Sequence, residues 1–256
     1  MAKYTIYPLK SGEFQKHEKS TLLYLQGFGE KIITPIIFYL VVGEGKNILV
    51  DTGCSNPEWA GKHHHPIVQT EDMQILNGLK KHNLTPDDIT CIVNTHLHWD
   101  HCWNNRLFPG KKIYVQKREM EFALNPIPMQ YAYYESEAIG LEPPFKRTMD
   151  QYELVDGDVN LFPGIDLVFI PGHTPGFQGV LVDTENGKYL IASDCLGTFK
   201  NWEGDAVHKH IPSAIHVDLN ECYATYEKIE KICDHILPGH DGRAFDHHSY
   251  PIRNEA

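Results

Sequence analysis

Hydrophobic positions fall into two paired runs that predict two β-hairpins. The first hairpin joins the uninterrupted apolar run 36–42 to the run 48–50 through a Gly-containing turn. The second ends in the apolar run 190–193, which also follows a Gly-containing turn. The two hairpins end alike, in Asp51 and Asp194. Apolar runs of this length bounded by such turns are typical of buried strands. We therefore expect two similar β-rich halves that pack face to face.

Elsewhere the pattern alternates between helical and strand-like periods. Helical spacing of apolar residues predicts helices at 73–82, 117–124 and 220–232. Short apolar runs predict strands at 89–94, 112–116, 159–161 and 167–170. Helices interleaved with two facing sheets predict an α/β fold, a four-layer αββα sandwich, in a single domain over 1–256.

The segment 125–144 is rich in Pro, Tyr and Glu and has no clear period. We interpret it as a loop or a lid. Its tyrosines Tyr131, Tyr133 and Tyr134 either belong to the surface that the lid presents or fasten the loop to the body of the domain.

Charge and composition narrow the classes of partner. The 256 residues include 23 Lys and Arg against 34 Asp and Glu, a formal net charge of −11. This balance argues against nucleic acid and anionic membranes, which need a basic face, and it disfavours strongly anionic substrates. No apolar run reaches the roughly 18–20 residues of a membrane span, and no secretory signal pattern is present at the start. The six cysteines lack CxxC spacing, so we expect reduced thiols and a cytoplasmic protein.

The last predicted helix, 220–232, leaves the oligomeric state open. We expect Tyr223, Tyr226, Ile229 and Cys233 to lie on one of its faces. That face fits either the core of the chain or a partner, so a monomer and a homodimer both remain open.

Sixteen histidines are unusual for a chain of this length, and three of them fall in one motif with an aspartate. The motif His96-Leu97-His98-Trp99-Asp100-His101 directly follows a predicted strand. On an extended backbone His96, His98 and Asp100 point the same way, and the next turn brings in His101. Three imidazoles and a carboxylate suit Zn²⁺, with Fe, Mn or Co as alternatives. The alternative is a polar loop of unrelated histidines, which the H-x-H-x-D-H spacing disfavours.

Three further candidate ligands follow predicted strands. His173 lies in a P-G-H-T-P-G sequence, Asp194 ends the second hairpin, and His240 lies in a P-G-H sequence. Nearby Gly and Pro allow the sharp turns that aim a side chain inward. Each residue alone is more typical of a turn. Together with the motif they complete a set of five histidines and two aspartates.

These motifs resemble those of the metallo-β-lactamase superfamily, which has an H-x-H-x-D-H motif, a G-H-T-x-G motif, a bridging aspartate and a late G-H. The resemblance extends from the D-T-G that begins at Asp51 to the G-H that ends at His240. It implies that Asp51 is a buried carboxylate that supports a ligand. It also implies a two-metal site, with His96, His98 and His173 on one metal, Asp100, His101 and His240 on the other, and Asp194 between them.

Within the superfamily the chain looks most like the N-acyl-homoserine lactonases, by its single-domain length, its strand end at 191–194 and its Asn-Trp-Glu at 201–203. Those lactonases usually place a tyrosine, which touches the substrate carbonyl, three residues after the bridging aspartate. Here that position is Gly197, and Phe199 is the nearest aromatic residue. One electrophilic hydrogen bond of the family is therefore missing at this position.

The resemblance implies a hydrolase with two divalent metal ions and no serine or cysteine nucleophile. A hydroxide bridging the metals would attack the carbonyl of a small-molecule ester or lactone. Asp100 is the candidate to carry the proton to the leaving oxygen. A neutral lactone with an acyl or aromatic tail suits the apolar residues of the lid segment.

Other functions of the same fold remain open: a thioesterase of the glyoxalase II kind, a β-lactamase or a phosphodiesterase. A periplasmic β-lactamase needs an export signal and glyoxalase II has an extra C-terminal helical region, so we expect neither. A non-catalytic metal-containing binding protein is the alternative from a different class. The complete ligand set disfavours it.

The remaining histidines are expected to matter less. His63, His64 and His65 lie between Lys and Pro, and we expect them to be solvated, with the mouth of a pocket as the alternative. Whether one of His208, His210 and His216 faces the cleft is left open.

Overall fold

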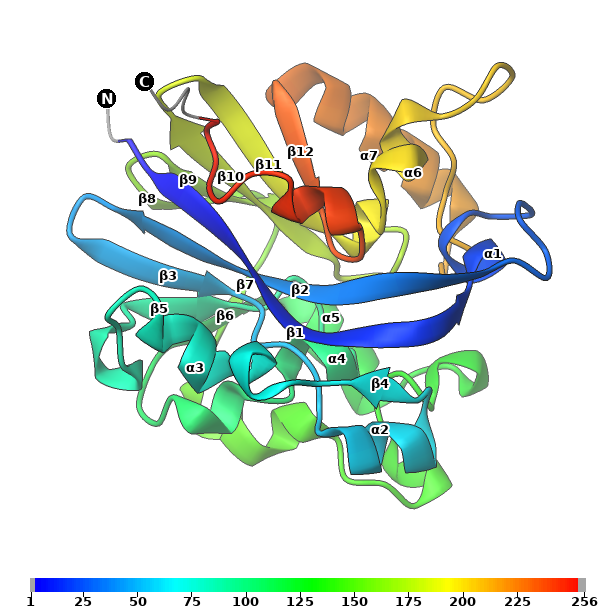
Figure 1. The fold of residues 1–256 in the computed structure, drawn as a ribbon, viewed down its shortest axis with the longest axis horizontal. Coiled ribbons are helices and arrows are strands. Elements are labelled where there is room, and N and C mark those ends of the chain that lie inside the picture. The colour runs from blue at the N-terminus through cyan, green and yellow to red at the C-terminus, as the bar shows by residue number, and fades with distance from the viewer. Residues whose placement is uncertain (1–2, 253–256) are drawn as a thin grey trace.

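Two β-sheets pack face to face, and helices cover the outer side of each sheet (Figure 1). Figure 1 shows a computed structural model, which describes residues 3–252. The arrangement is the four-layer αββα sandwich that the sequence predicts. Within the described residues, no helix is both long enough and apolar enough to cross a membrane.

The first sheet comprises β1 (Thr5–Glu18), β2 (Lys31–Gly43), β3 (Lys46–Val50), β4 (Ile67–Val68), β5 (Cys91–Val93), β6 (Ile113–Gln116) and β7 (Tyr152–Val155). The second comprises β8 (Val159–Phe162), β9 (Ile165–Phe169), β10 (Gln178–Thr184), β11 (Gly187–Ser193) and β12 (His235–Pro238). Their orders are β4-β1-β2-β3-β5-β6-β7 and β12-β11-β10-β9-β8. The helices are α1 (Lys19–Leu22), α2 (Pro57–His63), α3 (Ile75–Lys80), α4 (Trp99–Cys102), α5 (Lys117–Leu124), α6 (Phe199–Glu203) and α7 (Leu219–Ile232).

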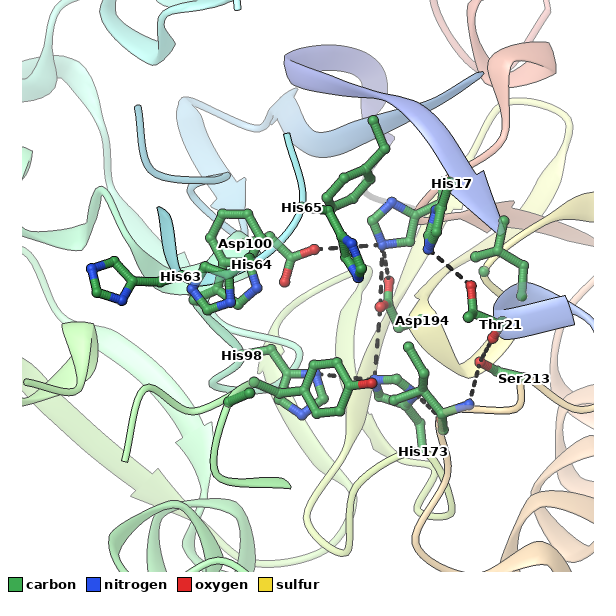
Figure 2. Close-up of a pocket in the computed structure, with 18 residues that line it drawn as sticks. His17, Thr21, His63, His64, His65, His98, Asp100, His173, Asp194 and Ser213 are labelled. Atoms are coloured by element: carbon green, nitrogen blue, oxygen red, sulfur yellow. Dashed lines mark hydrogen bonds and ion pairs between the residues drawn. The ribbon is translucent and has the colours of Figure 1, made fainter. Parts of the chain in front are cut away.

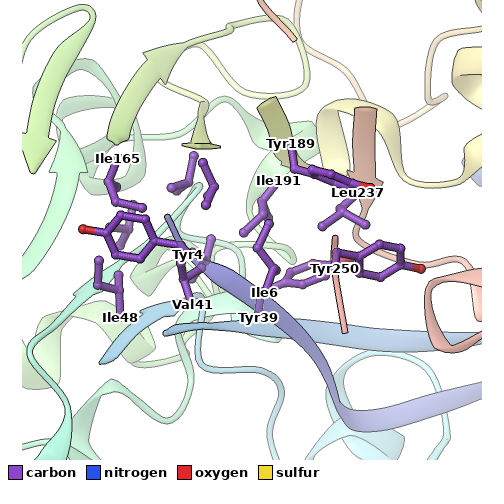
Figure 3. Packing of buried hydrophobic residues seen from close by; sticks show 14 of the residues in the cluster. Tyr4, Ile6, Tyr39, Val41, Ile48, Ile165, Tyr189, Ile191, Leu237 and Tyr250 are labelled. Carbon is purple, nitrogen blue, oxygen red and sulfur yellow. The ribbon is translucent and has the colours of Figure 1, made fainter. Parts of the chain in front are cut away.

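Strand β2 explains why its apolar run is continuous. Successive side chains of a strand point to opposite faces. Tyr39 and Val41 pack into the core between the sheets (Figure 3), whereas Phe38 and Leu40 pack with Ile75 of α3 on the outer face. Over 34–41, both faces of β2 are therefore buried, and a polar residue there has no solvated side to occupy.

Both predicted hairpins are present. Strand β2 pairs antiparallel with β3, and β10 pairs antiparallel with β11. The predicted strands at 112–116 and 167–170 and the helix at 117–124 match β6, β9 and α5 to within two residues at either end. The sequence patterns missed β1, β4 and β7 altogether.

Helix α7 buries most of the face that was expected, with Cys222 in place of Tyr223. Cys222, Tyr226 and Ile229 are buried, but Tyr223 is 45% exposed. The buried side chains pack on the outer face of the second sheet. The apolar side of α7 therefore serves the core. Cys233 packs against the same cluster, so the predicted face was wrong at Tyr223 only.

Candidate metal centre

The candidate ligands lie where strands of both sheets end. His96 and His98 follow β5, and His173 follows β9. Asp194 follows β11 and His240 follows β12. Strands β11 and β12 are parallel neighbours, so their carboxyl ends bring Asp194 and His240 to one edge of the second sheet.

The backbone of the H-x-H-x-D-H motif is not extended throughout. His98 precedes a helical turn, α4, which contains Asp100 and His101. The expected alternation therefore holds for His96 and His98 only. Asp100 reaches the site because the chain turns into α4, not because it continues a strand.

All seven predicted side chains lie together. Their ligand atoms form three groups, each with atoms within 4.8 Å of one another: His96, His98 and His173; His96, His101 and Asp194; and Asp100, His101 and His240. Asp194 lies between the groups, because its carboxylate is 3.3 Å from His101 Nε2, 3.2 Å from His240 Nε2 and 3.7 Å from His173 Nε2. Figure 2 shows Asp194, His98 and His173 converging on the same space.

Each of the five imidazoles donates one ring N–H away from the cluster. The acceptors are Thr95 Oγ1 for His96 (3.0 Å), Gln130 Oε1 for His98 (3.0 Å), Asp51 Oδ2 for His101 (2.9 Å), the Ile215 carbonyl for His173 (2.6 Å) and the Pro35 carbonyl for His240 (2.9 Å). A neutral imidazole that donates from one nitrogen has a lone pair on the other. These acceptors therefore aim five lone pairs into the cluster, as metal-ligating histidines require.

The cluster has buried polar atoms without a protein partner. Among the described residues, His96 Nε2, His101 Nε2 and Asp194 Oδ1 are buried and accept or donate no hydrogen bond. An unpaired buried polar atom costs about 1–3 kcal/mol, and three such atoms within one cluster favour a cation as their partner. The residues present fit two divalent metal ions.

The electrostatics of the cluster separate two kinds of histidine. Burial lowers the pKa of His96 and of His98 well below the usual value, so both are neutral. Burial is also the largest single effect on His101 and His240, but the nearby carboxylates, Asp194 foremost and then Asp100, together outweigh it and raise the pKa of both. The negative charge of the cluster is concentrated on the side of His101 and His240, where a cation would replace bound protons.

Asp51 is a supporting carboxylate, buried to 2% exposure. Its Oδ1 accepts from the main-chain N–H of Thr95, and its Oδ2 accepts from Thr95 Oγ1 and from His101 Nδ1. Strands β3 and β5 are parallel neighbours, so the residues that follow them meet at one edge of the first sheet. Asp51 thereby holds the backbone and one imidazole of the motif in place.

Two buried side chains that support the site were not predicted. Gln130 orients His98, and Glu119 of α5 accepts hydrogen bonds from the Leu97 main chain, Tyr134 and Thr174. Helix α5 is short and already has Met120 and Ala123 to bury, so its pattern gives no reason to bury Glu119. Only the tertiary contacts identify it as a buried acceptor.

A cavity of about 290 Å³ opens over the cluster. Its walls combine ligand residues with the aromatic and aliphatic side chains of Phe14, Leu22, Trp99, Tyr133 and Ile215. Part of the lid segment 125–144 therefore lines the cavity, through Ala132 and Tyr133. The cavity is large enough for a small organic molecule to approach the cluster.

Of the two interpretations given for His63, His64 and His65, the pocket mouth is the one found, although His65 is also exposed to solvent as expected. All three line this cavity (Figure 2). The His64 side chain is only 4% exposed, because its ring stacks on Trp99 and its Nε2 lies 2.7 Å from Glu135 Oε1. None of His208, His210 and His216 is among the residues that line it.

Phe199 does not take the place of the missing tyrosine. It packs against the core and lines a different cavity, together with Trp202 of α6 and residues of β12. Gly197 lines the cavity over the cluster, and a Cβ atom added there would meet only Leu22, at 3.5 Å. This part of the wall therefore has no side chain of its own.

Known proteins share both the sequence pattern and the fold. The pattern of the metallo-beta-lactamase superfamily matches residues 36–251. An N-acyl homoserine lactonase of Bacillus thuringiensis is 34% identical over 189 residues, which cover 69% of this chain and 70% of that protein. The N-acyl homoserine lactonase AttM of Rhizobium radiobacter is 29% identical over 255 residues, 94% of each chain. A solved N-acyl homoserine lactone hydrolase with N-hexanoyl-L-homoserine at its catalytic metal center superimposes with a TM-score of 0.75 and 26% identity over 96% of both chains.

Proposed function

The chain belongs to the metallo-beta-lactamase superfamily, and from this premise we propose that it is a dinuclear metal-dependent hydrolase that opens the ring of N-acyl homoserine lactones. The observation that carries the proposal is the orientation of the five imidazoles. Each has one nitrogen tied to a protein acceptor and the other directed into a cluster that also holds Asp100 and Asp194.

His96, His98 and His173 would hold one divalent ion, Asp100, His101 and His240 the other, and Asp194 both. Zinc is the expected metal, because imidazole and carboxylate ligands suit it. When bound, the ions supply a hydroxide nucleophile near neutral pH and polarise the carbonyl of the substrate.

Asp100 is one of the two carboxylates of this set that line the cavity, the other being Asp194. Its carboxylate lies 3.8 Å from the Nε2 atoms of both His101 and His240. We assign to Asp100 the transfer of a proton from the attacking water to the ring oxygen that leaves. This transfer avoids the release of an unprotonated alkoxide.

The cavity supports a neutral substrate with an apolar tail. Phe14, Leu22 and Ile215 give it apolar walls beside the cluster. The formal net charge of −11 makes strongly anionic substrates less favourable at long range. An N-acyl lactone is uncharged and has an acyl chain that such walls can bury.

Metal analysis combined with a substrate panel tests the proposal. The purified protein is loaded with zinc and offered N-hexanoyl homoserine lactone, a thioester, a chromogenic cephalosporin and a phosphodiester. We expect about two zinc ions per chain and turnover of the lactone well above that of the others. If the protein turns over the thioester, the cephalosporin or the phosphodiester faster than the lactone, the proposed substrate class is wrong.

A matched pair of variants tests the site. Asp194→Asn removes a charge from the centre of the cluster, and Asp205→Asn does so in an exposed turn. We expect Asp194→Asn to lose metal and turnover while Asp205→Asn keeps both. Full turnover by metal-free Asp194→Asn contradicts the mechanism, and tight lactone binding by the wild type without product indicates a non-catalytic binding protein.

A further inference from the structure

The hydroxyl of Tyr133 has no partner in the protein. Tyr133 is half-buried in the wall of the cavity over the cluster. Within residues 3–252, no hydrogen bond joins its phenol oxygen to another group, whereas the hydroxyl of the adjacent Tyr134 donates to Glu119 at 2.7 Å. The Tyr133 hydroxyl is not fully enclosed, so its free hydrogen remains available to a molecule in the cavity.

The other side-chain hydroxyls of the cavity wall are already engaged. Thr21 Oγ1 donates to the Glu18 carbonyl at 2.6 Å and lies 2.9 Å from His17 Nε2. Ser213 Oγ donates to the Thr21 carbonyl at 3.2 Å and accepts from the Ile215 main chain at 3.2 Å. Among the described lining residues, Tyr133 therefore supplies the one hydroxyl whose hydrogen is not already donated.

Tyr133 is held rigidly against the ligand motif. Its carbonyl accepts from the main-chain N–H of Trp99 at 2.8 Å, and Trp99 lies between the ligands His98 and Asp100. Its ring lies beside the His98 ring, with centroids 5.2 Å apart and an interplanar angle of 32°. The backbone position of this phenol is thus fixed relative to the cluster.

The residue pair after Tyr133 fastens the same segment from the other side. Tyr134 is tied to Glu119, as above, and Glu135 accepts from Trp59 Nε1 at 2.6 Å and lies 2.7 Å from His64 Nε2. Glu135 is fully buried and adopts a left-handed backbone, with φ of 49°. A non-glycine residue keeps such a conformation only where its surroundings enforce it. The segment therefore presents Tyr133 to the cavity as a preorganised group.

We propose that the Tyr133 hydroxyl donates a hydrogen bond to the carbonyl oxygen of the bound lactone, on which negative charge develops as the ring is attacked. A donor held in place before the reaction stabilises that charge without reorganisation. Tyr133 keeps its proton throughout, because burial raises the pKa of its phenol above the usual value. The phenol is thus supplied by the lid segment. It is not supplied from position 197, where the cavity wall is formed by a glycine without a side chain. This inference rests on the lactonase function proposed above.

The test is Tyr133→Phe, which removes one oxygen atom and keeps the ring. The matched control is Tyr131→Phe, two residues away in the same segment and outside the cavity wall. We expect the kcat of Tyr133→Phe to fall about 100-fold, with little change in KM, because the lost bond forms mainly in the transition state. Tyr131→Phe is expected to match the wild type. Metal content, melting temperature and calorimetric affinity for a lactam analogue are measured in parallel and are expected to stay close to wild-type values.

Three outcomes overturn the inference while the wild type still opens lactones. These are a kcat of Tyr133→Phe within twofold of the wild type, a change confined to KM, and a fall in metal content or melting temperature that makes the role structural. If the wild type itself opens no lactone, the proposed function fails first. The two failures are therefore distinguishable.

Discussion

Glu119 Oε1 accepts a hydrogen bond from the main-chain nitrogen of Leu97 at 3.0 Å, so a carboxylate of α5 holds the backbone between two predicted metal ligands. The other oxygen of Glu119 accepts from Thr174 Oγ1 at 2.6 Å, one residue beyond His173. Tyr134 of the lid segment donates to the same carboxylate. One buried residue thus ties together both loops around the first ligand group and the segment that presents Tyr133.

Glu119→Ala is expected to be severely destabilising. It would leave buried donors of Leu97, Thr174 and Tyr134 without an acceptor, at a combined cost of about 3 kcal/mol or more. Urea unfolding of the variant measures this loss. The control is Glu121→Ala on the exposed side of α5, which is expected to change the free energy of unfolding by less than about 0.5 kcal/mol. Equal effects of the two substitutions contradict the assigned role.

Asp51→Asn is expected to weaken metal binding through the tautomer of His101. The Asn oxygen is needed opposite the Thr95 main-chain N–H, so its amide NH₂ faces His101 Nδ1. A donor at that place favours the imidazole with its hydrogen on Nε2, the atom that faces the cluster. Competition with a zinc chelator should show an affinity about 10- to 100-fold lower than that of the wild type. An unchanged affinity contradicts this reasoning.

Gly239→Ala is expected to displace Asp194. A Cβ atom at Gly239 would lie 2.3 Å from Asp194 Oδ1, closer than nonbonded atoms approach. We expect metal affinity to fall about tenfold or more, because Asp194 lies between the ligand groups. Gly242→Ala is the control, since a Cβ atom there meets nothing within 4 Å. Zinc titration of both variants measures their affinities. If Gly239→Ala binds zinc as tightly as the wild type, the Asp194 carboxylate can shift without loss of affinity, which contradicts the prediction.

His17 is expected to make the metal-free protein less stable as pH falls. Burial lowers the pKa of His17 from 6.5 to about 3, and the neighbouring His240 and His65 add to the shift. Below the pKa that His17 has in the unfolded chain, the unfolded chain binds a proton at His17 that the folded protein does not bind. The contribution of His17 to the free energy of unfolding is therefore complete above about pH 6.5 and is lost as pH falls towards about 3.

His17→Gln removes this titration. The stability advantage of the wild type over His17→Gln should shrink by up to about 1 kcal/mol per pH unit between about pH 6 and about pH 4. Urea unfolding of both metal-free proteins at several pH values gives this difference. A constant difference across that range shows that His17 does not titrate as stated.

The sequence patterns predicted those strands whose burial produces a continuous run of apolar residues. Tyr39 and Phe38 face different layers of core, so the run 36–42 of β2 has no charged or small polar residue and is easily recognised. Strand β1 has no such run, because it contains Pro8 and Gly12 and its register against β2 shifts near Gly12. It is a strand because β2 offers hydrogen bonds along nearly all of its length. Such pairing depends on tertiary structure, so it cannot be predicted from the hydrophobic periodicity of one segment.

The same distinction applies to the site. The seven candidate ligands could be identified because His and Asp in tight motifs have few other reasons to occur together. Their supports could not, since Pro35 and Ile215 contribute only main-chain carbonyls. Glu135 and Tyr133 could be placed only once the fold had brought the lid segment against Trp59 and Trp99.

Each of the three ligand groups draws side chains from both sheets. His96, His98, Asp100 and His101 come from the end of β5, and His173, Asp194 and His240 come from the ends of β9, β11 and β12. A cation bound there would connect side chains from the two halves of the sandwich. Each group of ligand atoms is complete only when the two halves are packed together, so we expect metal binding to stabilise their packing.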